Sequence, residues 1–86
     1  MQYQEEFSDA ELARIIEEGL MYMCACPAQV AQGLRQLREL YRYQNQCMQD
    51  PANVSVVHQT ICHSTILAHA QLQDCLKRVL ELEQWD

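Results

Sequence analysis

The feature that most constrains the fold is a long helical pattern near the C-terminus, because residues 55–86 contain neither glycine nor proline. Within this run, apolar or small residues recur at alternating spacings of four and three. This is the heptad pattern of a helix that packs lengthwise against other helices. The seam consists of Val54, His58, Ile61, Thr65, Ala68, Leu72, Cys75, Val79 and Leu82. We therefore expect one helix over residues 54–84, roughly 45 Å long.

A second apolar line runs beside this seam and comprises Cys62, Ile66, His69, Leu76 and Leu80. Two adjacent lines make a stripe that is too wide for one partner helix. The long helix should therefore touch two others, either from its own chain or from a second chain. Since symmetric dimers are the commonest assembly, we expect a homodimer. Its interface residues are predicted to be Ile61, Ala68, Leu72 and Val79.

A first helix is predicted over residues 8–24. Ser8 and Glu11 have the spacing of a capping box, and Phe7 and Leu12 have that of a hydrophobic staple. Gly19 interrupts the apolar face of this helix. Glycine costs about 1 kcal/mol relative to alanine in a helix, but it permits a close crossing with another helix.

A second helix is predicted over residues 27–49. Pro27 suits a first helical position, where its missing amide hydrogen is no loss. The Asp50-Pro51 pair ends the helix, because the residue before a proline is disfavoured in helical geometry. Asn53 or Ser55 can then cap the third helix. A short turn makes the second and third helices antiparallel, so residues that face each other should have numbers that sum to about 103.

The composition agrees with few, long helices, since the 86 residues include only two glycines and two prolines. We expect a single all-α domain over residues 1–86. It should contain a short first helix and a long antiparallel helical hairpin, and complete a bundle by dimerisation. Strand-type runs of β-branched residues are nearly absent from the sequence.

The formal net charge of −6 argues against several classes of partner. Nucleic acids and anionic membranes attract positively charged surfaces, so we expect neither as a partner. The longest apolar stretch, residues 20–28, is interrupted by Pro27 and is too short to span a bilayer. We expect a cytoplasmic protein whose five cysteines remain reduced.

The Cys24-Ala-Cys26 turn is the sharpest chemical feature. Two thiolates there could bind a soft metal, and the antiparallel register would add Cys75 as a third ligand and His69 as an uncertain fourth. The corresponding cofactor would be zinc or an iron–sulfur cluster. Against this, paired zinc ligands usually have two to four residues between them, and free cysteine commonly serves as a small buried apolar residue. We favour packing, with no cofactor.

A second group, Cys47, His58 and Cys62, should lie at the other end of the hairpin. His58 and Cys62 are four residues apart and could hold a metal or begin a thiol-catalysis arrangement, but no acid is placed to orient the imidazole. A polar residue in a heptad seam more often fixes register. For His69, a hydrogen bond within the core is the favoured interpretation.

Three arginines at helical spacing form a stripe on the second helix: Arg35, Arg38 and Arg42. A stripe of this kind could contact phosphate, but the acidic charge of the chain disfavours that use. We expect it to face acids of the first helix, among them Asp9, Glu17 and Glu18.

No catalytic pattern is present: the sequence has no glycine-rich phosphate loop and no Ser–His–Asp arrangement. Our main hypothesis is a helical protein–protein interaction module, an adaptor or regulatory protein that is not an enzyme and binds itself and an unidentified protein partner. The alternative hypothesis is a metal, iron–sulfur or thiol-redox protein that uses Cys24 and Cys26 with Cys75.

Overall fold

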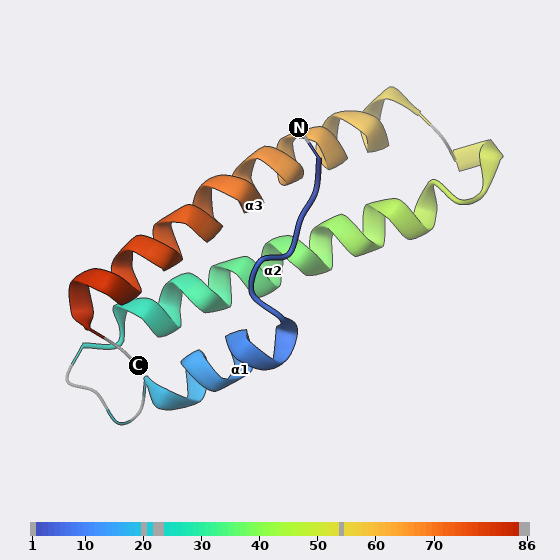
Figure 1. Ribbon diagram of the computed structural model, residues 1–86. Coiled ribbons are helices and arrows are strands. Elements are labelled where there is room, and N and C mark those ends of the chain that lie inside the picture. The colour runs from blue at the N-terminus through green and yellow to red at the C-terminus, as the bar shows by residue number, and fades with distance from the viewer. Residues whose placement is uncertain (1, 20, 22–23, 54, 85–86) are drawn as a thin grey trace.

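The computed structural model describes residues 2–19, 21, 24–53 and 55–84. Its elements are α1 (Asp9–Glu18), α2 (Cys26–Cys47), a short 3-10 helix η1 (Pro51–Asn53) and α3 (Val56–Glu83). Helices α2 and α3 lie side by side and run in opposite directions, and α1 lies along the first half of α2 (Figure 1). No strand occurs in the described residues. The all-helical fold with three α-helices is therefore confirmed.

Local capping signals set the starts of α1 and α3. The backbone N–H of Glu11 donates to Ser8 Oγ at 3.0 Å, and the N–H of Ser8 donates to Glu11 Oε1 at 2.8 Å, which completes the predicted capping box. Ser55 caps α3, since its Oγ accepts a hydrogen bond from the N–H of His58 at 3.4 Å. Both caps satisfy amide groups that have no partner inside the helix.

Helix α1 is shorter than the sequence predicts, because it ends at Glu18 and Cys24 lies outside any helix. Gly19 follows the helix at a close approach between α1 and α2. A Cβ atom added to it would lie 2.5 Å from the Cβ of Ala28. Glycine therefore both weakens the helix and allows this contact. The predicted continuation also includes positions 20, 22 and 23, which lie outside the described residues.

Helix α2 has Pro27 in its first turn, as predicted, although it begins one residue earlier, at Cys26. It ends at Cys47 rather than at residue 49, and the Asp50-Pro51 pair then starts η1. The N–H of Ala52 donates to Asp50 Oδ1 at 3.0 Å, so the aspartate side chain stabilises this turn.

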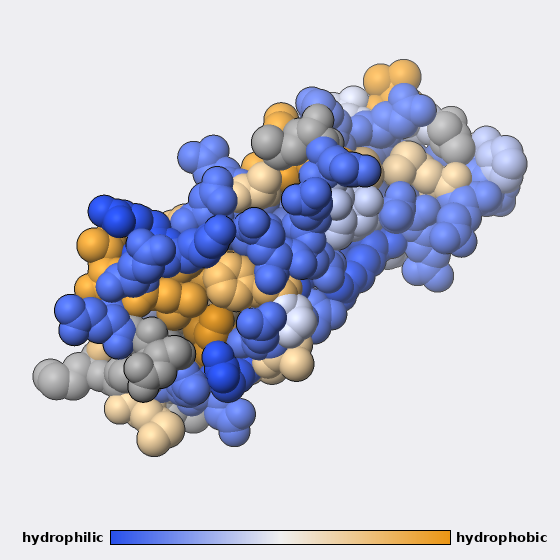
Figure 2. All heavy atoms as spheres, in the orientation of Figure 1, coloured by the Kyte–Doolittle hydropathy of each residue, from blue (hydrophilic) through white to orange (hydrophobic). Residues whose placement is uncertain are grey.

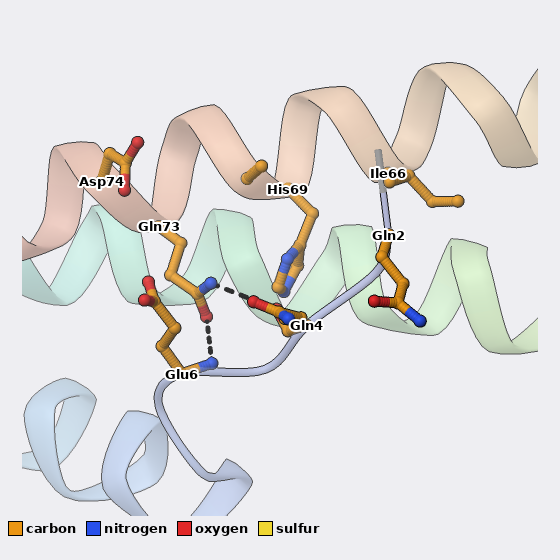
Figure 3. Close-up of a pocket in the computed structure, with 8 residues that line it drawn as sticks. Gln2, Gln4, Glu6, Ile66, His69, Gln73 and Asp74 are labelled. Atoms are coloured by element: carbon orange, nitrogen blue, oxygen red, sulfur yellow. Dashed lines mark hydrogen bonds between the residues drawn. The ribbon is translucent and has the colours of Figure 1, made fainter.

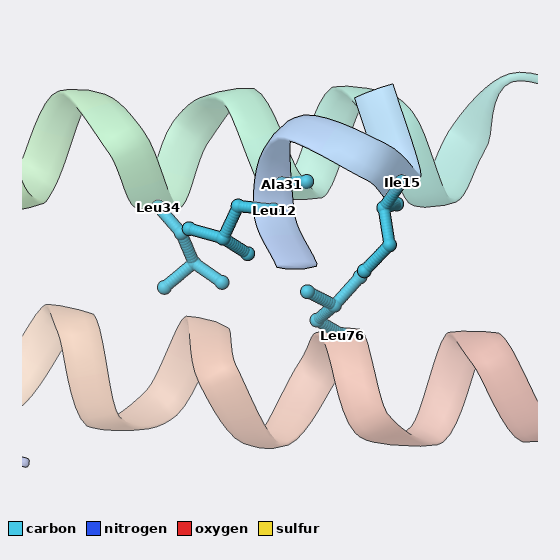
Figure 4. Close-up of a cluster of buried hydrophobic side chains, with 5 residues drawn as sticks. All are labelled: Leu12, Ile15, Ala31, Leu34 and Leu76. Atoms are coloured by element: carbon cyan, nitrogen blue, oxygen red, sulfur yellow. The ribbon is translucent and has the colours of Figure 1, made fainter. Parts of the chain in front are cut away.

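The buried apolar core is small and receives side chains from all three helices (Figure 4). Around it pack the partly buried residues Phe7, Ile16, Val30, Leu72 and Leu80. Since Phe7 precedes the cap of α1 and packs against the cluster that contains Leu12, the staple pair meets at this core. The cluster itself consists of Leu12, Ile15, Ala31, Leu34 and Leu76.

The buried line of α3 differs from the predicted heptad seam. The helix buries Thr65, His69, Gln73 and Leu76, of which only Thr65 belongs to that seam. The seam residues Ala68, Cys75 and Leu82 are exposed. The core of α3 thus follows the neighbouring line, so part of the apolar seam remains on the surface.

The molecule is elongated, with principal extents of 48 × 20 × 16 Å and a radius of gyration of 14.7 Å. A compact chain of this length would have a radius of about 12 Å. On the face shown in Figure 2, hydrophobic atoms gather between α1 and the C-terminal half of α3. Hydrophilic side chains cover most of the remaining surface of this face.

Candidate interaction sites

Arg38 is the centre of a buried polar cluster. Its guanidinium group is charged, and charged groups are rarely buried in proteins. Only 1% of this residue is exposed. Its Nη1 donates to Asp9 Oδ1 at 2.9 Å, its Nε to His69 Nε2 at 2.9 Å, and its Nη2 to Gln73 Oε1 at 3.2 Å. Each side of the guanidinium therefore has an acceptor, which a buried charge requires.

Arg42 lies one turn beyond Arg38 and binds two carboxylates. Its Nη2 donates to Glu5 Oε2 at 2.8 Å and to Asp9 Oδ2 at 3.0 Å. The predicted pairing of the arginine stripe with Asp9 is confirmed for Arg38 and Arg42. Of the other predicted acids, Glu18 pairs with Arg14 within α1 and not with the arginine stripe.

These contacts change the protonation equilibria of both carboxylates. The hydrogen bond from Arg38 is the largest effect on Asp9 and holds its pKa below the usual value. Burial by itself would raise the pKa of Glu5, but hydrogen bonds from Tyr3 and Arg42 outweigh it, so the pKa is lowered. The pKa of Arg42 is raised, mainly through its hydrogen bond to Glu5. The cluster is therefore arranged to hold its charges at neutral pH.

His69 is buried in this cluster and accepts a hydrogen bond from Arg38. Accepting through Nε2 requires the neutral imidazole with its proton on Nδ1. Burial, and then the nearby positive charge of Arg38, lower its pKa. The predicted role of His69 as a hydrogen-bonded core histidine agrees with this geometry.

The segment before α1, residues 2–7, crosses α3 and α2 and is called the strap below (Figures 1 and 3). Gln73 of α3 holds its main chain. Gln73 Oε1 accepts from the N–H of Glu6 at 2.8 Å and of Phe7 at 3.4 Å, and Gln73 Nε2 donates to the carbonyl of Gln4 at 3.1 Å. One buried side-chain amide thus provides the donor and the acceptor that a neighbouring strand would provide.

Tyr3 is the aromatic anchor of the strap. Its ring stacks on Tyr41 of α2 with centroids 3.8 Å apart and an angle of 11° between the rings, and it lies 4.8 Å from the ring of His69. Its hydroxyl donates to Glu5. Burial, followed by the hydrogen bond and charge of Glu5, raises the pKa of Tyr3. Its phenol group is therefore protonated throughout the physiological range.

A pocket of about 170 Å³ lies between the strap and α3 (Figure 3). Three glutamine side chains line it, and Gln73 is the one that is buried. Within the described part of the chain, every buried side-chain nitrogen and oxygen has a hydrogen-bond partner. The pocket therefore borders a satisfied network. Its lining consists of Gln2, Gln4, Glu6, Ile66, His69, Ala70, Gln73 and Asp74.

A second site is an open apolar groove of about 360 Å³ between α2 and α3, called the α2/α3 groove below. Residues 51–73, which include every lining residue from α3, contain no Asp, Glu, Lys or Arg. Leu40 is 40% exposed on the α2 side, and Leu67 is 45% exposed close by in sequence on α3. The groove is lined by Leu37, Leu40, Thr60, Ile61, Ser64, Thr65 and Ala68.

Of the four residues predicted for a dimer interface, two line the α2/α3 groove and two do not. Ile61 and Ala68 line the α2/α3 groove, the first half-buried and the second exposed. Leu72 packs against the core of its own chain, and its Cδ2 would lie 3.0 Å from a Cβ added to Gly33. Val79 is half-buried. Leu72 therefore already has an intramolecular role.

The structure does not unite the predicted metal ligands Cys24, Cys26, Cys75 and His69. No three His, Cys, Asp or Glu side chains in the described ranges lie close enough together to hold a metal ion. Cys75 is exposed, whereas His69 is buried beside Arg38. Cys24 does lie close to Cys26, whose thiol is the main cause of a raised pKa at Cys24, with a smaller effect from Glu83.

The second group of predicted residues is held by a different hydrogen bond. Nδ1 of His58 lies 2.7 Å from Oε1 of the buried Gln44. Cys47 and Cys62 are half-buried free thiols. The polar residue in the seam thus joins α3 to α2, as the structural interpretation of His58 predicts.

Sequence reasoning missed Gln73, which organises the strap. One signal could have identified it, because the second apolar line passes from His69 to Leu76 and its regular spacing includes position 73. Glutamine is mostly exposed in folded proteins, and it occurs twelve times in this chain. Its amide became a core group only because the strap covers it.

No protein-family model, curated protein or solved structure matches this chain. None of the described helices is long and apolar enough to cross a membrane.

Proposed function

We propose that this protein is a cytoplasmic helical protein–protein interaction module that works without catalytic activity and forms a homodimer through the α2/α3 groove. One observation carries the proposal: the groove is apolar, open and bordered by a 23-residue segment, 51–73, without charged side chains. Exposed helix faces of soluble proteins usually carry charges, and contiguous apolar patches mark contact sites.

The exposed area supports a second copy as the occupant. The chain exposes 5936 Å², whereas a typical monomer of 10.0 kDa exposes about 5200 Å². The difference of about 700 Å² is close to the roughly 800 Å² that each partner buries in a stable interface. A two-fold axis beside the groove would place Ile61 and Ala68 of each copy against the other.

A charge in the groove tests the dimer. Ala68→Glu places a carboxylate at an exposed groove position, so the fold should persist while the interface is lost. Ala13→Glu is the matched control, because Ala13 is also an exposed mid-helix alanine but lies on α1. Light scattering after size-exclusion chromatography should show a dimer for the parent and for Ala13→Glu, and a monomer for Ala68→Glu. A parent that is monomeric at micromolar concentration refutes the dimer.

A further inference from the structure

The strap meets the hairpin as a bound peptide meets its receptor. Tyr3, Glu5 and Phe7 make its stacking, ionic and core contacts, and Glu6 adds an ion pair with Lys77 at 3.8 Å. Gln2, Gln4, Glu5 and Glu6 are exposed. Main-chain hydrogen bonds fix the segment and these side chains determine its identity, which is the logic of extended-peptide recognition.

The receptor side of this contact consists of groups that fold with the helices. Gln73 and Arg38 are 3% and 1% exposed, and Arg42 and Tyr41 lie next to them on the surface of α2. These groups provide an amide donor and acceptor, two guanidinium groups and an aromatic ring. Their combined preference is for a main chain with an aromatic residue two positions before a carboxylate.

The strap itself is held by few buried side chains. Four of its six residues are exposed, and Tyr3 and Phe7 are half-buried. Segments with little apolar burial open at low free-energy cost. If the strap left, water would replace the main-chain partners of Gln73, whereas a similar peptide would restore the direct hydrogen bonds. Exchange for such a peptide therefore recovers the contacts that simple opening loses.

We propose that the surface beneath the strap is a binding site for an extended acidic peptide of a partner protein, with the pattern aromatic–any–acidic. The strap is its intramolecular competitor and occupies the site until such a peptide replaces it. The inference deepens the proposed function, since it assigns the chemistry of the protein partner. It is independent of the α2/α3 groove, which involves other residues.

The test weakens the strap in the full chain and leaves the receptor side unchanged. Tyr3→Ala/Glu5→Gln removes the stacking ring and the carboxylate. The probe is a fluorescein-labelled synthetic peptide with the sequence of residues 2–8. Its binding to the protein is measured by fluorescence polarisation. Because the parent site is already occupied, the double variant should bind the probe at least about tenfold more tightly than the parent.

Two controls assign any binding to this site. A probe that carries the same two substitutions should not bind, and adding Arg42→Gln, at a half-exposed side chain, should abolish binding of the original probe. Circular dichroism confirms the fold of each variant, and Glu5→Gln alone replaces the double variant if that one unfolds. Equal affinity of parent and weakened variant for the probe, or equal binding of both probes, overturns the proposal.

Light scattering of the same samples separates this result from the dimer. If a monomeric protein binds the probe, the peptide site is supported and the homodimer is refuted. If a dimeric protein binds no probe, the homodimer is supported and the peptide site is refuted.

Discussion

At the scale of single residues, Arg38 donates hydrogen bonds to three other side chains, those of Asp9, His69 and Gln73. Its removal in Arg38→Met leaves His69 Nε2 without its donor and Gln73 with one donor fewer, both in buried positions. We expect the free energy of unfolding to fall by about 2–4 kcal/mol. Urea denaturation followed by circular dichroism measures this change.

Arg35→Met is the matched control, because Arg35 is exposed on the same helix and makes no ion pair within the described residues. Its effect should remain within about 0.5 kcal/mol. Equal losses in the two variants would mean that the cluster contributes nothing specific to stability.

His69 makes the stability depend on pH. Its pKa is lowered in the folded protein, so near pH 6.5 the unfolded chain binds the proton more readily. Its contribution is complete above about pH 6.5 and is lost as the pH falls through that value and then through the lower folded pKa. The lowered pKa values of Asp9 and Glu5 extend the loss to more acidic solution.

Denaturation at pH 7.5 and pH 5.5 checks the histidine effect. The parent should be less stable at pH 5.5, and His69→Gln should show a smaller difference between the two conditions. His63→Gln, at an exposed position of the same helix, should retain the difference of the parent. A His69→Gln profile identical to that of the parent contradicts the assignment.

At the scale of the elements, each of the two glycines lies where an added Cβ would meet a side chain of another helix. Gly19→Ala would place a Cβ 2.5 Å from the Cβ of Ala28, where neither helix can yield without a backbone shift. We expect a loss of about 1–3 kcal/mol, as measured by thermal or urea denaturation.

Gly33→Ala is the comparison, because its new Cβ would meet only the end of the flexible Leu72 side chain, at 3.0 Å. The gain in helix propensity, about 1 kcal/mol, opposes this contact. Its effect should therefore be small. If Gly19→Ala proved as mild as Gly33→Ala, the close crossing of α1 and α2 would be wrong.

Helix α3 has a partly polar buried line and a more apolar seam beside it. Its buried line contains three polar residues, Thr65, His69 and Gln73, each with a hydrogen-bond partner. Its more apolar seam includes the exposed Ala68, which lines the α2/α3 groove. The helix thus packs through a partly polar face and leaves apolar side chains for another contact, which favours the proposed dimer.

At the scale of the whole molecule, the proposed dimer predicts a melting temperature that depends on concentration. Assembly stabilises the folded state by mass action, so a hundredfold increase in protein concentration should raise the melting temperature by about 5–10 °C. Ala68→Glu should remove this dependence. A parent melting temperature that is constant over the same range would exclude a dimer coupled to folding.

The three helices and the signals at their starts could be predicted from neighbouring residues alone. Ser8 with Glu11, Pro27 and Ser55 act within one helical turn, so neighbouring residues are sufficient to specify them. The pairing of Arg38 and Arg42 with Asp9 was also predictable, because helical spacing and opposite charge are both visible in the sequence. The end of α1 at Glu18 was not, since the contact of Gly19 with Ala28 belongs to the packing of two helices.

Which polar residues are buried depends on packing between segments that are distant in the sequence. Gln73 is buried because the strap, more than sixty residues away in sequence, supplies partners for its amide, and no local pattern encodes a contact of that range. The same packing places His69 against Arg38 and leaves Ala68 of the heptad seam on the surface. Periodicity specifies the faces of a helix, but the choice among those faces depends on all the elements that compete to cover them.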